Sequence, residues 1–192
     1  MKVIVIGATG TIGSAVARQL EDRGHQVVRA ARRGPVTVDL EDMASVNALF
    51  ASVPDADAVV CCAASGRLTP LDSPSDDDFT VGLRGKLIGQ VQLARRALHH
   101  LRDGGTIVLT GGVFERPTPG GAFGALVNAG LEAFVEAAAI ELPRGLRLTA
   151  IRPGWVAETL AALGRDPAAG TPAAEVARHY VDAVEGAQPC AP

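Results

Sequence analysis

Short apolar runs alternate with amphipathic stretches along the chain, and this alternation predicts strands separated by helices. Apolar runs bounded by turn residues predict strands at 2–6, 26–30, 35–38, 57–61, 106–109 and 146–151. Apolar positions at helical spacing predict helices at 12–23, 42–53, 79–101, 122–142, 158–163 and 172–184. Strands that alternate with helices indicate an α/β protein whose parallel sheet is covered on both faces. Because crossovers between parallel strands are right-handed, we expect a Rossmann-type, doubly wound sheet in the order 3-2-1-4-5-6.

Residues with special backbone preferences are expected to end some of these elements. An aspartate and two glycines at 103–105 are expected to close the long helix 79–101. Thr171 and Pro172 are expected as the N-cap and the first residue of the last helix. Beyond Glu185 the chain holds two prolines and few β-branched residues, which argues against an ordered seventh strand.

Length and composition limit the class of protein. The 192 residues, 47% of them hydrophobic, predict a single domain over 1–192 with a short substrate-side segment at about 155–185. The formal net charge of −3 leaves no basic excess for nucleic acid, and no apolar run approaches the roughly 18 residues of a membrane span. The apolar run at 2–6 is too short for a signal peptide. We therefore expect a cytoplasmic protein with a small-molecule substrate and no metal, because metal-ligand spacing is absent around Cys61, Cys62 and Cys190.

Three glycines follow the first expected strand, in the sequence Gly7-Ala8-Thr9-Gly10-Thr11-Ile12-Gly13. Gly7 permits a tight turn, Gly10 lets the backbone approach a pyrophosphate, and Gly13 allows the helix to pack closely on the strand. The first turn of the helix offers free N–H groups and the positive end of its dipole to an anion. The turn therefore predicts dinucleotide binding through Gly7, Thr9, Gly10, Thr11 and Ile12; the alternative is a tight turn with a structural role alone.

The end of the second strand indicates which dinucleotide binds. Dehydrogenases that prefer NAD carry an acidic side chain there, which holds the ribose hydroxyls. This chain has Arg32 instead, with Arg29 before it and Arg33 directly after it. A guanidinium matches a phosphate dianion in charge and in geometry. The sequence therefore predicts NADP(H) as the cofactor; the alternative is a solvated basic loop.

Together with the glycine turn, five further segments resemble the short-chain dehydrogenase/reductase family over nearly the whole chain. These segments are Val38-Asp39-Leu40, Cys61-Cys62-Ala63-Ala64, Gly105-Thr106-Ile107-Val108-Leu109, Ala129–Phe134 and Arg152-Pro153-Gly154-Trp155-Val156. The resemblance implies cofactor contacts, at the adenine or the nicotinamide, from Asp39, Leu40, Cys62, Ala63, Ala64, Pro153, Gly154 and Val156. It also implies a homo-oligomer, a dimer or tetramer, assembled through the helices at 79–101 and 122–142.

The residues that the family uses for catalysis are the main departure from the resemblance. The alignment puts Gly124 where the family has its tyrosine, and Asn128 where it has its lysine. Gly112 stands at the position of the family's serine, and Lys86 at the position of its asparagine. The chain's only tyrosine, Tyr180, belongs to the last expected helix, so that no simple shift of the alignment restores it.

Lysine and asparagine have thus changed places, which would keep one ammonium and one amide beside the nicotinamide ribose. We interpret this exchange as compensation: Lys86 would hold the ribose hydroxyls or, with its pKa lowered by burial, transfer a proton. A water ordered by Lys86 and Asn128 is the other candidate proton source. Thr110 would position the substrate, because its hydroxyl is a poor acid. The alternative for Lys86 is a surface lysine whose stem packs on its helix.

These features predict an NADP(H)-dependent oxidoreductase that acts on a small carbonyl or alcohol by a tyrosine-independent mechanism. The departures from the family's catalytic residues leave two alternatives open. One is a non-redox enzyme on the same scaffold, such as a cyclase, isomerase or dehydratase. The other is an NADP(H)-binding protein without catalysis. Fold alone does not choose among the three.

Overall fold

Six parallel strands form one sheet in the order β3-β2-β1-β4-β5-β6, which confirms the predicted Rossmann-type topology. This computed structural model describes residues 1–64 and 66–186. The stretch 187–192, which belongs to the segment where we argued against a seventh strand, lies outside the described residues. The strands are β1 (Lys2–Ile6), β2 (Gln26–Ala31), β3 (Val36–Thr37), β4 (Ala56–Cys61), β5 (Leu101–Thr110) and β6 (Arg147–Ile151).

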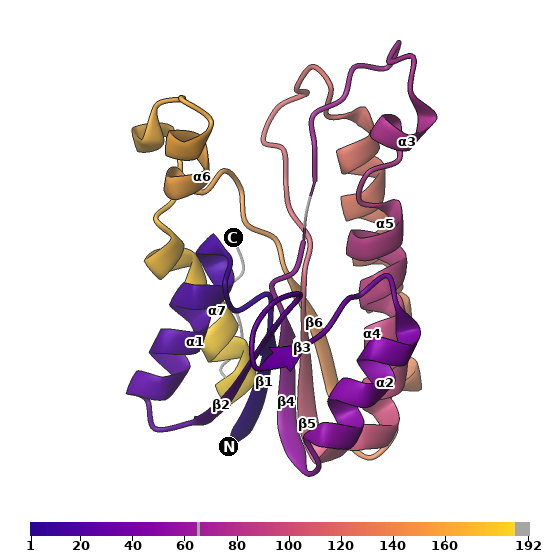
Figure 1. The fold of residues 1–192 in the computed structure, drawn as a ribbon, viewed down its shortest axis with the longest axis vertical. Coiled ribbons are helices and arrows are strands. Elements are labelled where there is room, and N and C mark those ends of the chain that lie inside the picture. The colour runs from indigo at the N-terminus through magenta and orange to yellow at the C-terminus, as the bar shows by residue number, and fades with distance from the viewer. Residues whose placement is uncertain (65, 187–192) are drawn as a thin grey trace.

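Helices cover both faces of the sheet, so that the sheet is the middle of three layers (Figure 1). One face carries α1 and α7, and the other carries α2, α4 and α5 (Figure 1). The main helices are α1 (Thr11–Asp22), α2 (Met43–Ser52), α4 (Gln90–His100), α5 (Ala122–Ala138), α6 (Ala157–Ala162) and α7 (Ala173–Glu185).

Each central strand contributes to two separate hydrophobic cores, because successive side chains point to opposite faces of the sheet. In β1, Ile4 and Ile6 belong to the core under α2 and α4. Val3 and Val5 belong to the core under α1 and α7. All four side chains are buried. This double burial explains why the strands read as continuous apolar runs in the sequence.

The expected helix at 79–101 is wrong, because the structure divides this segment. The short helix α3 (Asp76–Phe79) ends in a turn, a π-helix follows at Leu83–Gly89, and only then does α4 begin. Gly82 marks the break: its φ of +99° lies in the left-handed region, which the interior of an α-helix does not use. Apolar residues continue at helical spacing across the break, so periodicity did not detect it.

Asp103, Gly104 and Gly105, which we expected to close a helix, lie instead within β5. The ladder between β5 and β4 is irregular after Leu101, and its regular register resumes at Thr106. Between these two residues Gly104 adopts a φ of +75°. The glycines therefore serve a bulge at the start of a strand.

The last helix, α7, begins one residue later than expected. Pro172, not Thr171, is its N-cap residue. The carboxylate of Glu158 accepts hydrogen bonds from the N–H of Ala173 at 2.9 and 3.1 Å, and so takes over the capping that Thr171 was expected to provide.

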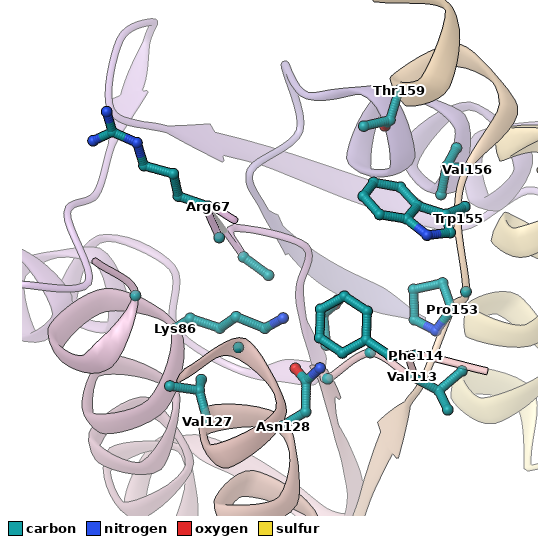
Figure 2. Close-up of a pocket in the computed structure, with 18 of the residues that line it drawn as sticks. Arg67, Lys86, Val113, Phe114, Val127, Asn128, Pro153, Trp155, Val156 and Thr159 are labelled. Carbon is teal, nitrogen blue, oxygen red and sulfur yellow. The ribbon is translucent and has the colours of Figure 1, made fainter. Parts of the chain in front are cut away.

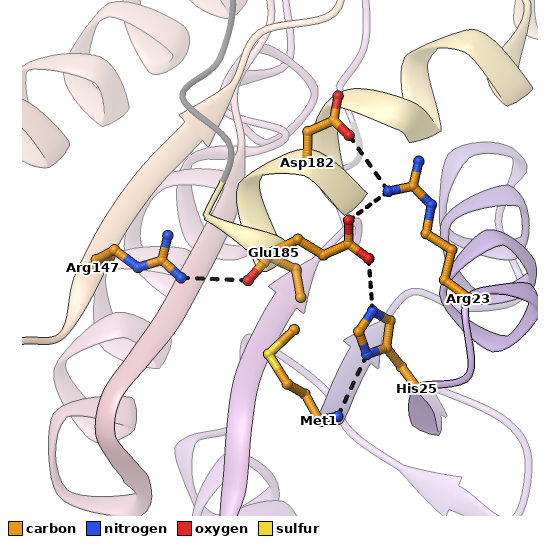
Figure 3. Close-up of polar contacts among 7 residues, drawn as sticks. Met1, Arg23, His25, Arg147, Asp182 and Glu185 are labelled. Carbon is orange, nitrogen blue, oxygen red and sulfur yellow. Dashed lines mark hydrogen bonds and ion pairs between the residues drawn. The ribbon is translucent and has the colours of Figure 1, made fainter.

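An ionic network ties α7 to the end of α1 and to the start of the chain (Figure 3). Glu185 accepts a hydrogen bond from Arg23 at 2.5 Å and lies 3.0 Å from a ring nitrogen of His25. Arg23 also lies 3.7 Å from Asp182, and the other ring nitrogen of His25 lies 3.5 Å from the amino group of Met1. The contacts with His25 and Arg23 hold the pKa of Glu185 below its usual range. The network lies at the amino-terminal ends of β1 and β2, away from the edge where α/β folds bind ligands.

The helix α5 and the turn that follows it form the most apolar long helix among the described residues. By length and composition, Ala122–Glu141 could cross a membrane, which differs from our expectation that no stretch approaches this length. In the structure α5 packs on β6 and on the π-helix, and most of its surface faces outward. Leu126 and Ile140 are 61% and 91% exposed on this outer face.

Candidate active site

The strand order reverses between β1 and β4, and the carboxyl ends of these strands open a crevice there. Two cavities occupy it. The first, which we call the turn cavity, has a volume of about 600 Å³ and is lined by the glycine turn and by the residues after β2. The second, which we call the lysine cavity, has a volume of about 570 Å³ and is lined by Lys86 and by the loops after β5 and β6. Ala64 lines both, so the two cavities adjoin.

The glycine turn has the geometry that the sequence predicted. Gly7 adopts a φ of +79°, which favours glycine. A Cβ on Gly13 would lie 2.1 Å from the carbonyl oxygen of Gly7, so only glycine allows α1 to begin this close to β1. A Cβ on Gly10 would contact only the carbonyl oxygen of Gly7, at 3.3 Å, and its other side faces the open cavity. The turn therefore leaves bare backbone at the N-terminus of α1, where a pyrophosphate would bind.

The structure brings most of the predicted cofactor residues into the turn cavity. Those that line it are Gly7, Thr9, Gly10, Arg32, Arg33, Asp39, Leu40, Cys62, Ala63 and Ala64. Arg32 and Arg33 make no ion pair with any residue in the described part of the chain. Two further polar or small residues, Glu41 and Gly85, line the cavity and were not predicted.

Two predicted residues lie outside both cavity linings. Arg29 donates two hydrogen bonds to the carboxylate of Glu21 on α1, at 2.8 and 2.7 Å. Its guanidinium is therefore held by a carboxylate and does not join Arg32. Thr11 is the exposed first residue of α1, and neither cavity includes it.

The remaining predicted residues line the lysine cavity. They are Ile12, Lys86, Thr110, Asn128, Pro153, Gly154 and Val156. Phe114, Trp155 and Arg165 also line it, and the last two belong to the segment at about 155–185 that the sequence analysis placed on the substrate side. Phe114 and Trp155 are large aromatic side chains in glycine- and proline-rich loops, and that position was the available signal for a ligand cavity.

Lys86 enters the cavity from the π-helix. The N–H of Leu87 donates to the carbonyl of Gly82 at 3.1 Å, five residues earlier, which is the hydrogen bond of a widened turn. Figure 2 shows the Lys86 amine pointing toward Asn128 and the ring of Phe114. Burial lowers the pKa of Lys86, and no described residue lining the cavity is acidic. An amine in this setting can release a proton more readily than a surface lysine.

Asn128 presents a buried acceptor with nothing bound to it. Its Oδ1 is shielded from solvent and has no hydrogen-bond partner among the described residues. A buried polar atom without a partner is costly, and such atoms mark places where a ligand or water completes the structure. Asn128 and Lys86 lie on α5 and the π-helix and meet in one cavity, as the sequence predicted for the exchanged pair.

Two glycines make room for neighbouring side chains in the lysine cavity. A Cβ on Gly112 would lie 3.2 Å from Nδ2 of Asn128, so the carboxamide covers the space of a side chain there. A Cβ on Gly124 would lie 3.3 Å from the ring of Phe114, so this ring covers the corresponding space on α5. These are the positions that the resemblance aligned with the family's serine and tyrosine. No tyrosine or serine occurs among the described residues that line the cavity.

The hydroxyl of Thr110 is already used inside the protein. It donates to the carbonyl of Cys61 at 2.5 Å and lies 2.8 Å from the hydroxyl of Tyr180. Because a carbonyl can only accept, Thr110 must give its proton to Cys61, and Tyr180 must then donate to Thr110. Gln90 binds both the N–H and the carbonyl of Thr110, at 2.8 and 2.9 Å. The predicted role of Thr110 toward a substrate is therefore not what the geometry provides: the residue fixes the end of β5.

Replacing Gly112 by alanine is expected to disturb the cofactor end of the lysine cavity. The new methyl group would press on the Asn128 carboxamide and so destabilise the folded state. Loss of a glycine lowers the entropy of the unfolded chain and so has the opposite effect. The free energy of unfolding should therefore change by less than about 1 kcal/mol. Calorimetry should show NADPH binding weakened severalfold. Gly130→Ala is the control, because its Cβ would meet Leu87 at an ordinary 3.4 Å. Equal NADPH affinity in the two variants would contradict the assigned position of Asn128.

Comparisons with known proteins agree with this geometry. The model of the family described as enoyl-(acyl carrier protein) reductase matches residues 19–180. The protein lin1944 from Listeria innocua is 36% identical with a TM-score of 0.90, and the match covers 98% of this chain and 96% of that chain. A small-chain dehydrogenase solved in complex with NADPH is 25% identical with a TM-score of 0.83, covering 96% and 91%.

A curated relative matches a smaller part of the chain. A component of the phenolphthiocerol/phthiocerol polyketide synthase of Mycobacterium tuberculosis is 31% identical over 118 residues, or 50% of this chain. The chain spans only 8% of the length of that protein. The family model and the solved structures, in contrast, match most of the chain, and the crevice lies where their fold binds a dinucleotide. The chain belongs to the short-chain dehydrogenase/reductase family.

Proposed function

We propose that this protein is an NADP(H)-dependent oxidoreductase that reduces a small carbonyl compound, or oxidises the matching alcohol, with Lys86 in place of a tyrosine as the proton-transferring group. One observation carries the proposal. The amine of Lys86 and Oδ1 of Asn128, neither of which has a hydrogen-bond partner in the part of the chain that the structure describes, meet in a cavity that adjoins the glycine turn. A cofactor and a substrate would satisfy both groups.

The residues of the two cavities fit an extended NADP(H) molecule. The bare backbone at Gly10 suits the pyrophosphate, and the adenosine would extend toward Asp39. Arg32 and Arg33 would bind the 2′-phosphate, since neither forms an ion pair with a described residue. The nicotinamide half would reach the lysine cavity beside Gly154. A structural relative solved with NADPH supports this choice of cofactor.

When bound, NADPH supplies the hydride for the reduction. Lys86 in its ammonium form donates a proton to the substrate oxygen, so that a carbonyl, one hydride and one proton give the alcohol. The neutral amine then recovers a proton from water. Burial favours this transfer because it lowers the pKa of Lys86 toward neutral pH. Oδ1 of Asn128 accepts a hydrogen bond from a ribose hydroxyl or from the ammonium and keeps these groups aligned.

Replacing Lys86 by methionine is expected to lower kcat for carbonyl reduction by about 10²- to 10⁴-fold, the usual contribution of a general acid. In the unaltered protein kcat should fall as pH rises through the Lys86 pKa, which lies below its ordinary value, because only the ammonium donates. The methionine variant should lose this limb of the pH profile. Steady-state kinetics with NADPH and a panel of carbonyl compounds would measure both effects.

Lys86→Arg separates charge from proton transfer. It keeps the positive charge but does not deprotonate in the accessible range, so NADPH binding should survive while the pH-dependent limb disappears. An unchanged pH profile in both variants would remove Lys86 from the mechanism. Turnover of a compound without any change in nicotinamide absorbance would instead support the non-redox alternative. That alternative is favoured by one observation: neither tyrosine nor serine occurs among the described residues that line the cavity.

Replacing Arg32 by alanine is expected to weaken NADPH binding by about 10- to 100-fold, the worth of a charge-assisted hydrogen bond to phosphate. NADH lacks this phosphate, so its affinity should stay within about twofold. Arg29→Ala is the matched control, because Arg29 pairs with Glu21 outside the turn cavity. Fluorescence titration of both coenzymes would measure the affinities. A loss of NADPH affinity in the control as large as in Arg32→Ala would contradict the assignment.

We also propose that two copies of the chain pair through α5, with the π-helix at its edge. Leu126 of α5 and Ile140 of the turn that follows α5 are largely exposed, and Ile88 of the π-helix is 48% exposed. The family resemblance implies a dimer through these same helices. Burying this face would remove apolar surface from water, which is the main favourable term in association.

Leu126→Glu is expected to convert a dimer into a monomer, because a charge would be buried in the contact. Size-exclusion chromatography with light scattering at micromolar concentration would measure the mass. Leu71→Glu is the control, since Leu71 is equally apolar, 79% exposed, and lies in the loop before α3. A monomeric unaltered protein, or a dimer in both variants, would overturn this interface.

A further inference from the structure

The lysine cavity combines cationic side chains with apolar walls. Three of the described residues that line it are cationic, Arg67, Lys86 and Arg165, and none is acidic. The chain as a whole has a formal net charge of −3, so this local excess is opposite to the charge of the protein. A concave site with one sign of charge attracts the opposite charge.

We propose that the substrate is an oxo acid: a carbonyl compound that carries a carboxylate, bound by Arg165 at the mouth of the lysine cavity. This inference rests on the proposed function, because it names the substrate class of the same site.

Arg165 is held in place without a carboxylate partner. Its guanidinium carbon lies 5.5 Å from the centre of the Trp155 ring, a cation–π contact. Its backbone N–H donates to the carbonyl of Leu160 at 2.9 Å, which anchors it at the end of α6. No described carboxylate forms an ion pair with it. A guanidinium stacked on an aromatic ring keeps its N–H donors free. Because the stacking already orders the side chain, less conformational entropy is lost when an anion binds.

The other cations of the cavity do not compete for this role. Arg67 pairs with Asp78 at 2.6 Å, and Figure 2 shows its guanidinium directed away from the centre of the cavity. Lys86 points to the interior, where the reacting carbonyl would lie. Glu115 lies near Gly154 but does not line the cavity. Its negative charge would keep the carboxylate of a substrate away from Gly154. Arg165 is therefore the guanidinium without a described acidic partner that an incoming carboxylate would meet.

The walls of the lysine cavity suit an apolar body. Phe114 and Trp155 face this space, and Val113 lies beside them (Figure 2). Aromatic side chains pack well against flat, conjugated groups. A matching substrate would have a carbonyl for Lys86 at one end, a planar apolar middle for the aromatic side chains, and a carboxylate for Arg165 at the other end.

A matched pair of substrates tests the proposal: para-acetylbenzoate and its neutral amide, para-acetylbenzamide, which have nearly the same shape. The ratio of their kcat/KM values with NADPH is expected to favour the acid by about tenfold or more, the worth of one charge-assisted contact. In Arg165→Met this ratio should fall to about one, with the loss in the acid alone and with NADPH affinity unchanged. Arg178→Met is the control, because Arg178 lies on α7 outside both cavities.

Calorimetry separates failure of this inference from failure of the proposed function. Benzoate and benzamide would be titrated into the protein, with and without NADP⁺. If neither carbonyl compound is reduced but benzoate still binds better than benzamide and loses this advantage in Arg165→Met, the anion site stands and the proposed reaction fails. If the amide is used and bound as well as the acid, or if Arg165→Met keeps the preference, the oxo-acid inference is overturned while the proposed function stands on its own tests.

Discussion

The close approach of α1 to the end of β1 is the contact on which the rest of the site depends. It is possible because Gly13 has no side chain: a Cβ there would collide with the carbonyl oxygen of Gly7. This approach brings the N-terminus of α1, with its free N–H groups, to the point where the strand order reverses. The turn cavity and the lysine cavity extend from this point in two directions, so the cofactor's phosphates would fix the position of both of its ends.

Both cavities are lined in part by charged side chains without an ion pair among the described residues. Some arginines elsewhere, such as Arg29, Arg102 and Arg144, lie against carboxylates within hydrogen-bond or ion-pair distance. Around the crevice, Arg32 and Lys86 have no such partner among the described residues. Burial lowers the pKa of Lys86, and no acidic side chain described in the cavity compensates for the lost hydration of its charge. The buried amine therefore does not stabilise the fold. Groups left in this condition are typical of sites that a ligand completes.

Two glycines of the lysine cavity leave room for neighbouring side chains. Glycine at 112 admits the carboxamide of Asn128, and glycine at 124 admits the ring of Phe114. The widened turn of the π-helix directs Lys86 into the same space. A larger side chain at 124 would press on the ring of Phe114, so the two positions depend on one another.

The sequence by itself determined the order of the strands, the glycine turn and most of the residues that line the turn cavity. These features depend on local rules: side-chain alternation in strands, right-handed crossovers, and the backbone freedom of glycine. The tertiary structure decided the rest. It assigned Arg29 to Glu21 and the hydroxyl of Thr110 to Cys61, because a polar side chain binds whichever partner the fold brings near. It also broke the long helix at Gly82 and placed the side chains of Asn128 and Phe114 against Gly112 and Gly124. These features leave no periodic trace in the sequence, because they depend on the backbone of one glycine and on contacts between separate segments.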